Sequence, residues 1–544
     1  MRVDVDQTEP TTLTDGRKPR CAALWLSLIL LLGFGLRVAG LTWGQAFCYG
    51  SQGDCLDAYR VAVNYAHGEP RALYIGQPNF NEHSKLPGPL WAMFCAAGLH
   101  LWGSINGVVW VIILLNTAAI YLTYLLAART VGFPAALWAA LLIATSPEAV
   151  KFSVVVFNPV VMSFFGACLF LALWRVVQQD RSRAAFWLVL LPLVMLQFHM
   201  SGLMLIPAII LVLWLKPARL HYPWLVAGVI AGLTLYLPYV CGEIAHRWEN
   251  ACGMMSGRHR GYSIEVLKIF SAVPSFLVNF WGPRWTFQPH EYQEIGRACF
   301  GSFSVLVGFN VVSIILAGFL AVGAFGTINA ALRGFWRSPR ATFARSPGMV
   351  FLTVIFVAPL MTSLVEGKRF HGRYCLVLLA PLFSLAAMGA VRWLSMPRIR
   401  QIFLSLLLLT LGANVWLVLT VFRYQGKCIE QGSLFVSSFS NLETVYQSLK
   451  DHADKSQLIR VEDDEFQEDE YMREMAITSR WASSYPHHIC TYVAIRERGS
   501  SLLSTSQPPV SIYKIVLADQ VKPDNPAVAY REHGIALVAV PAKP

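Results

Sequence analysis

The chain has 544 residues, of which 55% are hydrophobic and only 14% are charged, and its formal net charge is +12. This composition excludes an ordinary soluble protein of the same length. It also favours no nucleic-acid partner, because most of the excess positive charge is spread over short loops between apolar segments.

Taken in chain order, the apolar segments predict about 11 transmembrane helices. A run of about 20 apolar residues is long enough to cross the hydrocarbon core of a bilayer. The first run exceeds the length of a signal-peptide core, so we expect it to be a span. The predicted spans are residues 21–41, 105–128, 134–151, 159–177, 185–199, 202–216, 223–241, 302–332, 347–365, 374–392 and 401–422.

The segment 87–103 decides the topology, because counting it as a span would reverse the side of everything after it. When it is left out, all but one of the strongly basic short loops fall on one side, which the positive-inside rule assigns to the cytoplasm. We therefore expect residues 1–20 to be a cytoplasmic tail and 87–103 to be an interfacial helix. This helix would lie in a first outer loop, 42–104, and a second long outer loop would span 242–301.

The last part of the chain, residues 423–544, is polar and predicts a small α/β domain outside the membrane, after a membrane domain formed by 21–422. Apolar alternation in CTYVAIR, SIYKIVLA and GIALVAVPA predicts strands. The stretches LETVYQSLKDH and EYMREMAITSRW predict helices.

The first outer loop carries two carboxylates, Asp54 and Asp57, in the stretch GDCLDAYRVA. Either could cap a helix that begins near Leu56, since Asp favours helix starts. Either could also act as a general base. The eleven cysteines include no CxxC pair, which leaves a metal cluster unsupported. Cys48 and Cys55 could close a small disulfide loop, and free thiols are an equal alternative.

One outer turn, EGKRFHGR at 366–373, breaks the charge rule with three cations, Lys368, Arg369 and Arg373. They could be interfacial side chains whose charges reach toward water. They could also bind an anion at the membrane surface.

Five stretches in order resemble the GT-C glycosyltransferases, nearest to the protein O-mannosyltransferase-like branch and the lipid A aminoarabinose transferases. The resemblance covers about residues 20–395. The stretches are GDCLDAYRVA, HSKLPGPLWAMFCAAGLHLWG, ATSPEAVKFSVVVFNPVVMSFF, LQFHMSGLMLIP and RFHGRYCLVLLAPL. The resemblance implies an all-α polytopic membrane protein of GT-C type in a bacterial cytoplasmic (inner) membrane. It also implies transfer of a sugar from a polyprenyl phosphate-linked donor to an acceptor glycan, lipid or protein at the outer face.

The resemblance also implies the roles of the candidate site residues. Asp54 is expected to be the general base, with Asp57 as the alternative. Donor phosphate binding is expected of Lys85, His199, Lys368, Arg369 and Arg373, and Lys151 is a further candidate cation. Glu82, His83, Asn158 and Tyr374 are expected to line the site. Because Asn158 stands where relatives carry an aspartate, we predict no metal and no other cofactor.

Two other functions stay open at this point. A transporter or flippase for a lipid-linked saccharide should carry polar residues along mid-span faces, and Arg37 near the end of the first span is the partial exception to their scarcity here. A polysaccharide polymerase or ligase would place its working loop late in the chain. The sugar, the acceptor and the oligomeric state are not predicted.

Overall fold

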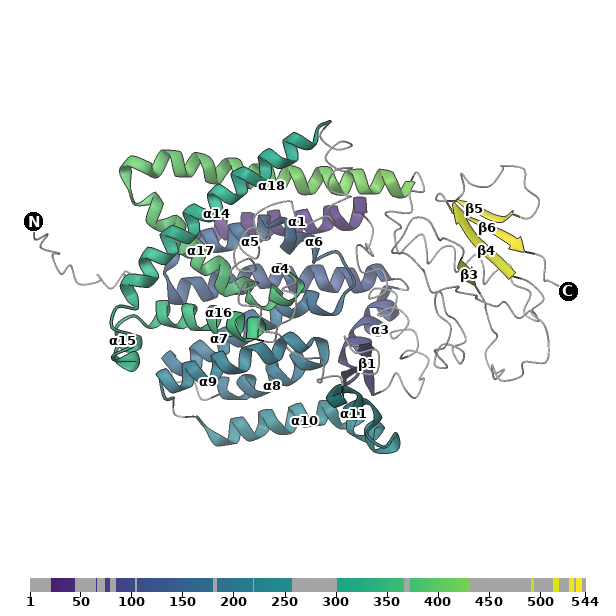
Figure 1. Cartoon of the computed structure of the whole chain (residues 1–544), viewed down its shortest axis with the longest axis horizontal. Coiled ribbons are helices and arrows are strands. Elements are labelled where there is room, and N and C mark those ends of the chain that lie inside the picture. Colours follow the sequence, from purple (N-terminus) through teal and green to yellow (C-terminus); the bar gives the residue numbers. More distant parts are fainter. Residues whose placement is uncertain are drawn as a thin grey trace, which may run out of the picture.

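We describe the chain from a computed structural model. The described residues are 21–44, 65, 74–78, 85–102, 105–179, 183–218, 220–256, 301–365, 372–430, 491–493, 512–517, 528–532 and 535–540, with backbone alone at some of them. A bundle of apolar helices forms most of the molecule, and a small sheet lies near the carboxyl end (Figure 1).

Each helix of the bundle overlaps one of the predicted spans. They are α1 (Cys21–Gly44), α4 (Ile105–Thr130), α5 (Phe133–Thr145), α7 (Met162–Gln179), α8 (Ala184–Phe198), α9 (Ile206–Leu215), α10 (Tyr222–Ala245), α14 (Phe303–Ala331), α16 (Pro347–Val365), α17 (Leu379–Leu394) and α18 (Pro397–Glu430). Within the described residues, seven helical segments are long and apolar enough to cross a membrane, and α5, α8, α9 and α16 belong to shorter apolar helices. The protein is a multi-pass membrane protein, as predicted.

Shorter elements join these helices. They are α3 (Leu90–Trp102), α6 (Pro147–Lys151), η2 (Asn158–Val161), η3 (Met200–Leu205), α11 (Glu249–Ser256), α15 (Pro339–Arg345), η6 (Gly372–Leu378) and the two-stranded β1 (Ile75–Pro78) and β2 (Lys85–Pro87). Figure 1 shows α3, β1 and α11 gathered at one end of the bundle and α15 at the other. We call these the α3 end and the α15 end. Helix α3, which forms most of the segment expected to be an interfacial helix, packs on α4.

The outward faces of the long helices are apolar. Leu31 on α1, Ile210 on α9 and Phe325 on α14 are each more than 60% exposed. Such a density of exposed large apolar side chains is unusual on a protein in water, whereas lipid tails accept it without cost. Inside the bundle, α4, α5 and α17 pack on one another and α14 packs on α17, which leaves most of α17 buried.

One predicted span is shorter than expected, because the segment 134–151 is divided at Ser146. Ser146 has an extended backbone, with ψ of 119°, because the residue before a proline avoids the helical region. Its hydroxyl oxygen accepts a hydrogen bond from the backbone N–H of Ala149 at 3.4 Å and caps the separate helix α6.

The carboxyl-terminal sheet has four antiparallel strands in the order β3-β4-β6-β5. They are β3 (Thr491–Val493), β4 (Ile512–Leu517), β5 (Val528–Glu532) and β6 (Ile535–Val540). Strands β3, β4 and β6 lie in the three stretches in which the sequence predicted strands, and β5 was not predicted. The two helices predicted in this domain lie outside the described residues. Helix α18 continues to Glu430, beyond the boundary expected at 422.

Candidate functional site

Helix α8 is the element at which three short elements meet. It contacts β2, which begins at Lys85, and it contacts η2 and η3. The turn η6 in turn contacts η2, η3 and α7. Four of the five stretches that carry the resemblance therefore come together, although they are separated by up to several hundred residues in the sequence.

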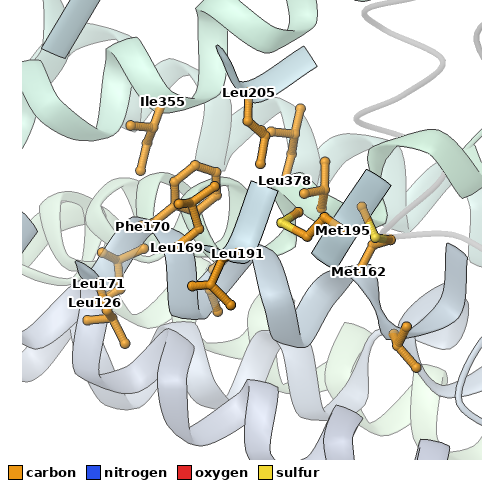
Figure 2. Close-up of a cluster of buried hydrophobic side chains, with 14 of the residues drawn as sticks. Leu126, Met162, Leu169, Phe170, Leu171, Leu191, Met195, Leu205, Ile355 and Leu378 are labelled. Carbon is orange, nitrogen blue, oxygen red and sulfur yellow. The ribbon is translucent and has the colours of Figure 1, made fainter. Parts of the chain in front are cut away.

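A buried apolar cluster holds these turns in place. Figure 2 shows Met195 of α8 among Met162 of α7, Leu205 of η3 and Leu378 of η6. All four side chains are at most 5% exposed. Because a packed core tolerates little change of volume, this cluster fixes the separations of the turns above it.

His199 lies between α8 and η3 with a fixed ring orientation. Its Nδ1 atom accepts a hydrogen bond from the backbone N–H of Ser201 at 3.0 Å and lies 2.9 Å from the Ser201 hydroxyl. A backbone N–H can only donate, so Nδ1 carries no proton and the neutral ring has its proton on Nε2. The side chain is 9% exposed. His199 can thus present an N–H donor in a nearly dry site.

The other predicted site residues are placed in part. Asn158 is the first residue of η2 and is 8% exposed, and Pro159 follows it in the first turn. The backbone of Lys85 lies in β2, and the backbones of Arg373 and Tyr374 lie in η6. The remaining predictions fall outside the described residues: Asp54, Asp57, Glu82, His83, Lys368 and Arg369.

Lys151 ends α6, which packs on α1, α5 and α18 rather than on the turns that carry the other candidates. Its Nζ atom lies 5.7 Å from the centroid of the Phe152 ring. The role of Lys151 in the site stays a prediction.

Glu148, which the sequence reasoning missed, lies in α6 and is only 4% exposed. Its Oε2 atom has no hydrogen-bond partner among the described residues. Burial raises the pKa of this carboxyl to about 7, although Lys151 acts to lower it. The signal in the sequence was the run Ser146-Pro147-Glu148, which is typical of a helix start between two apolar segments.

Arg37 has a structural role and is not a member of the candidate site. The guanidinium is 1% exposed, and its Nε donates to the Ser153 hydroxyl at 3.0 Å. Its Nη1 donates to the carbonyl oxygens of Gly33 at 2.8 Å and Ala144 at 3.4 Å. Arg37 also borders a cavity of about 10 Å³ that Asn116 and Ser163 help to line. That volume suits about one water molecule.

Within the described ranges, no group of three His, Cys, Asp or Glu side chains could hold a metal ion. Cys241 and Cys252, near the α3 end of the bundle, are free thiols. The proposed Cys48–Cys55 pair lies outside the residues that the structure describes.

Comparison with known proteins finds similarity in structure but not in sequence. No family model matches the chain, and no curated protein is significantly similar to it. The apo structure of ArnT from Cupriavidus metallidurans has a TM-score of 0.56 and 12% identity, covering 95% of this chain and 98% of that chain. The chain has the GT-C fold.

Two further structures resemble this GT-C fold more weakly. ArnT from the same organism bound to undecaprenyl phosphate has a TM-score of 0.48 and 13% identity, covering 95% of this chain and 97% of that chain. The apo oligosaccharyltransferase of Archaeoglobus fulgidus has a TM-score of 0.45 and 13% identity, covering 79% of this chain. The chain spans about 60% of the length of that oligosaccharyltransferase. The apo ArnT structure, at 12% identity, shows the fold alone, so reaction and substrates must be argued from the site.

Proposed function

We propose that the protein is a membrane glycosyltransferase. It transfers a sugar from a polyprenyl phosphate-linked donor to an acceptor at the outer face of a bacterial cytoplasmic membrane, and the α3 end of the bundle faces outward. The observation that carries this proposal is that the elements of Lys85, Asn158 and His199 meet on α8, while the turn of Arg373 packs on η2 and η3. The GT-C fold and the order of the five sequence stretches support it.

The proposed reaction exchanges one bond at the anomeric carbon of the sugar. The acceptor hydroxyl oxygen attacks this carbon, the bond from the carbon to the phosphate oxygen breaks, and the lipid phosphate leaves with the electron pair. Asp54 takes the hydroxyl proton as general base, or Asp57 does so in the alternative assignment.

The departing phosphate needs donors of hydrogen bonds and positive charge. His199 offers an Nε2–H donor whose ring is already oriented by Ser201, so no reorganisation is required during the reaction. Lys85, Lys368, Arg369 and Arg373 would supply the positive charge. The catalytic scheme requires no metal, in keeping with an asparagine at 158.

A transporter is the less supported alternative. Its best sequence evidence was Arg37, a charged residue within the first span. In the structure Arg37 bonds to Ser153 and to two backbone carbonyls, which accounts for its presence without a transport path.

Sugar transfer by purified variants tests the proposal. Asp54→Asn keeps the size of the side chain but cannot accept a proton, so transfer from a radiolabelled polyprenyl phosphate sugar should fall by about 10²–10⁴-fold. Asp57→Asn should change the rate far less, through a helix-start effect of about 0.5–2 kcal/mol. The reverse pattern would exchange the two roles. Normal rates in both variants would refute the general-base assignment and leave Glu82 as the next candidate.

A further inference from the structure

Gln197, in the last turn of α8, is fully buried and joins three elements. Its Oε1 atom accepts a hydrogen bond from the backbone N–H of Leu90, the first residue of α3, at 3.3 Å. Its Nε2 atom donates to the backbone carbonyl of Leu235 in α10 at 3.2 Å. A buried amide is costly unless both ends are bonded, and here each end has a partner on a different element.

The turn between β2 and α3 packs closely against the side-chain amide of Gln197. Gly88 has a φ of +111°, a conformation that side chains with a Cβ rarely adopt. A Cβ added at Gly88 would overlap the amide of Gln197. The close approach thus requires glycine, and Gln197 sets where the chain runs between Lys85 and Leu90.

An aromatic cluster adds to the contact between α8 and α3. Phe198 follows Gln197, and its ring lies 6.1 Å from that of Trp91 and 6.0 Å from that of Phe94, both in an edge-on arrangement. Trp91 and Phe94 belong to the first turns of α3, so α3 cannot slide along α8 without breaking these contacts.

We propose that Gln197 is a positioning residue for the donor phosphate. It fixes the turn 85–89 against α8 so that Lys85 is presented beside His199, which lies two residues after Gln197 in the chain. The inference rests on the proposed function, since it assigns Lys85 to the lipid phosphate. Gln197 itself need not touch the substrate.

The test uses the full-length protein and undecaprenyl phosphate without a sugar as the probe. Gln197→Met keeps the size of the side chain and removes both hydrogen bonds, and it should weaken binding about ten-fold. Tyr236→Phe is the matched control, because the Tyr236 hydroxyl donates to the Leu193 carbonyl at 2.9 Å and so joins α10 to α8 through a bond that does not involve Gln197. It should leave the Kd unchanged.

A double-mutant cycle separates positioning from general loss of structure. Lys85→Ala should weaken binding. Adding Gln197→Met to it should weaken binding no further, because the turn then carries no Lys85 side chain to be positioned. An equal loss in the presence and absence of Lys85 would overturn the proposal. An unchanged Kd in Gln197→Met, with weak binding in Lys85→Ala, would overturn it while leaving the proposed function standing.

Two other outcomes are also decisive. A normal Kd in Lys85→Ala would remove Lys85 from the phosphate site, and the inference would fail with that part of the proposed function. If Gln197→Met does not fold, Gly88→Ala replaces it, since the added Cβ displaces the same amide from the turn. Binding by a folded Gly88→Ala variant that equals wild type would then refute the positioning role.

Discussion

The backbone N–H of Ser201 decides which nitrogen of His199 can donate. Because Nδ1 accepts this N–H at 3.0 Å, any hydrogen bond that the neutral ring donates comes from Nε2. A histidine in an apolar stretch is often only a hydrogen-bonded structural residue, and our proposal assigns the two uses of His199 to different ring atoms. This division of roles makes His199 testable by substitutions that imitate one nitrogen at a time.

His199→Gln should retain more activity than His199→Asn. The longer amide can place an N–H near the position of Nε2, whereas the amide of asparagine reaches only as far as Nδ1. Loss of one preorganised donor to a developing negative charge costs about 2.7–4 kcal/mol, or about 10²–10³ in kcat. Transfer rates of the two purified variants, each checked for its thermal midpoint, measure the difference. Equal rates would make His199 a structural cap of η3.

The identity of single residues was the part that the sequence predicted least. His199 and Asn158 stood out because polar side chains are expensive beside apolar spans. Gln197 did not, although it is the most buried polar residue of its stretch. Its importance depends on Leu90 and Leu235, which are distant in sequence, and no local pattern reports such contacts.

At the scale of elements, the sequence predicted helices well and their interruptions poorly. All eleven predicted spans are helical, because long apolar runs admit few alternatives in a bilayer. The break at Ser146-Pro147 was missed because the hydropathy of a span is averaged over many residues, and the apolar residues on both sides hide two polar or turn-forming ones. The 3-10 turns η2, η3 and η6 were likewise absorbed into neighbouring spans or loops, and these turns carry the candidate site.

Helix α6 exists as a separate element, and this gives Glu148 a pH-dependent effect on stability. The folded-state pKa is about 7 against an ordinary value of 4.5, so the folded protein holds this proton more tightly than the unfolded chain. The resulting destabilisation is absent below about pH 4.5, grows as the pH rises and is complete above about pH 7.

Glu148→Gln removes the ionisable group, so the variant should gain stability relative to wild type as the pH rises through this window. Thermal midpoints of detergent-purified protein between about pH 4.5 and pH 8 measure the gain. Glu249→Gln, at the exposed start of α11, is the matched control and should run parallel to wild type. A constant difference between Glu148→Gln and wild type across the range would contradict the buried ionisation.

For the whole molecule, the distribution of basic residues agrees with a single inside face. Arg129 lies in the last turn of α4, Arg392 lies in the last turn of α17, and Lys216 follows α9. Arg340 lies in α15, and its Nε donates to the carbonyl oxygen of Trp214 near the end of α9 at 3.1 Å. These residues gather at the α15 end, so we expect that end to face the cytoplasm.

Two exposed tryptophans at opposite ends of the bundle allow this topology to be tested. Trp336 is 94% exposed near α15, and Trp248 is 47% exposed beside α11. In a background without native cysteines, Trp248→Cys should react with an impermeant thiol reagent in cells whose outer envelope is permeabilised. Trp336→Cys should react only after the inner membrane is lysed, because positive-inside charge places it in the cytoplasm. Ser504→Cys should behave like Trp248→Cys if the carboxyl-terminal domain is outside.

Early reaction of Trp336→Cys together with protection of Trp248→Cys would show the opposite topology, with the α15 end outside and the α3 end in the cytoplasm. The turns around α8 would then face the cytoplasm, and a donor presented at the outer leaflet could not reach them.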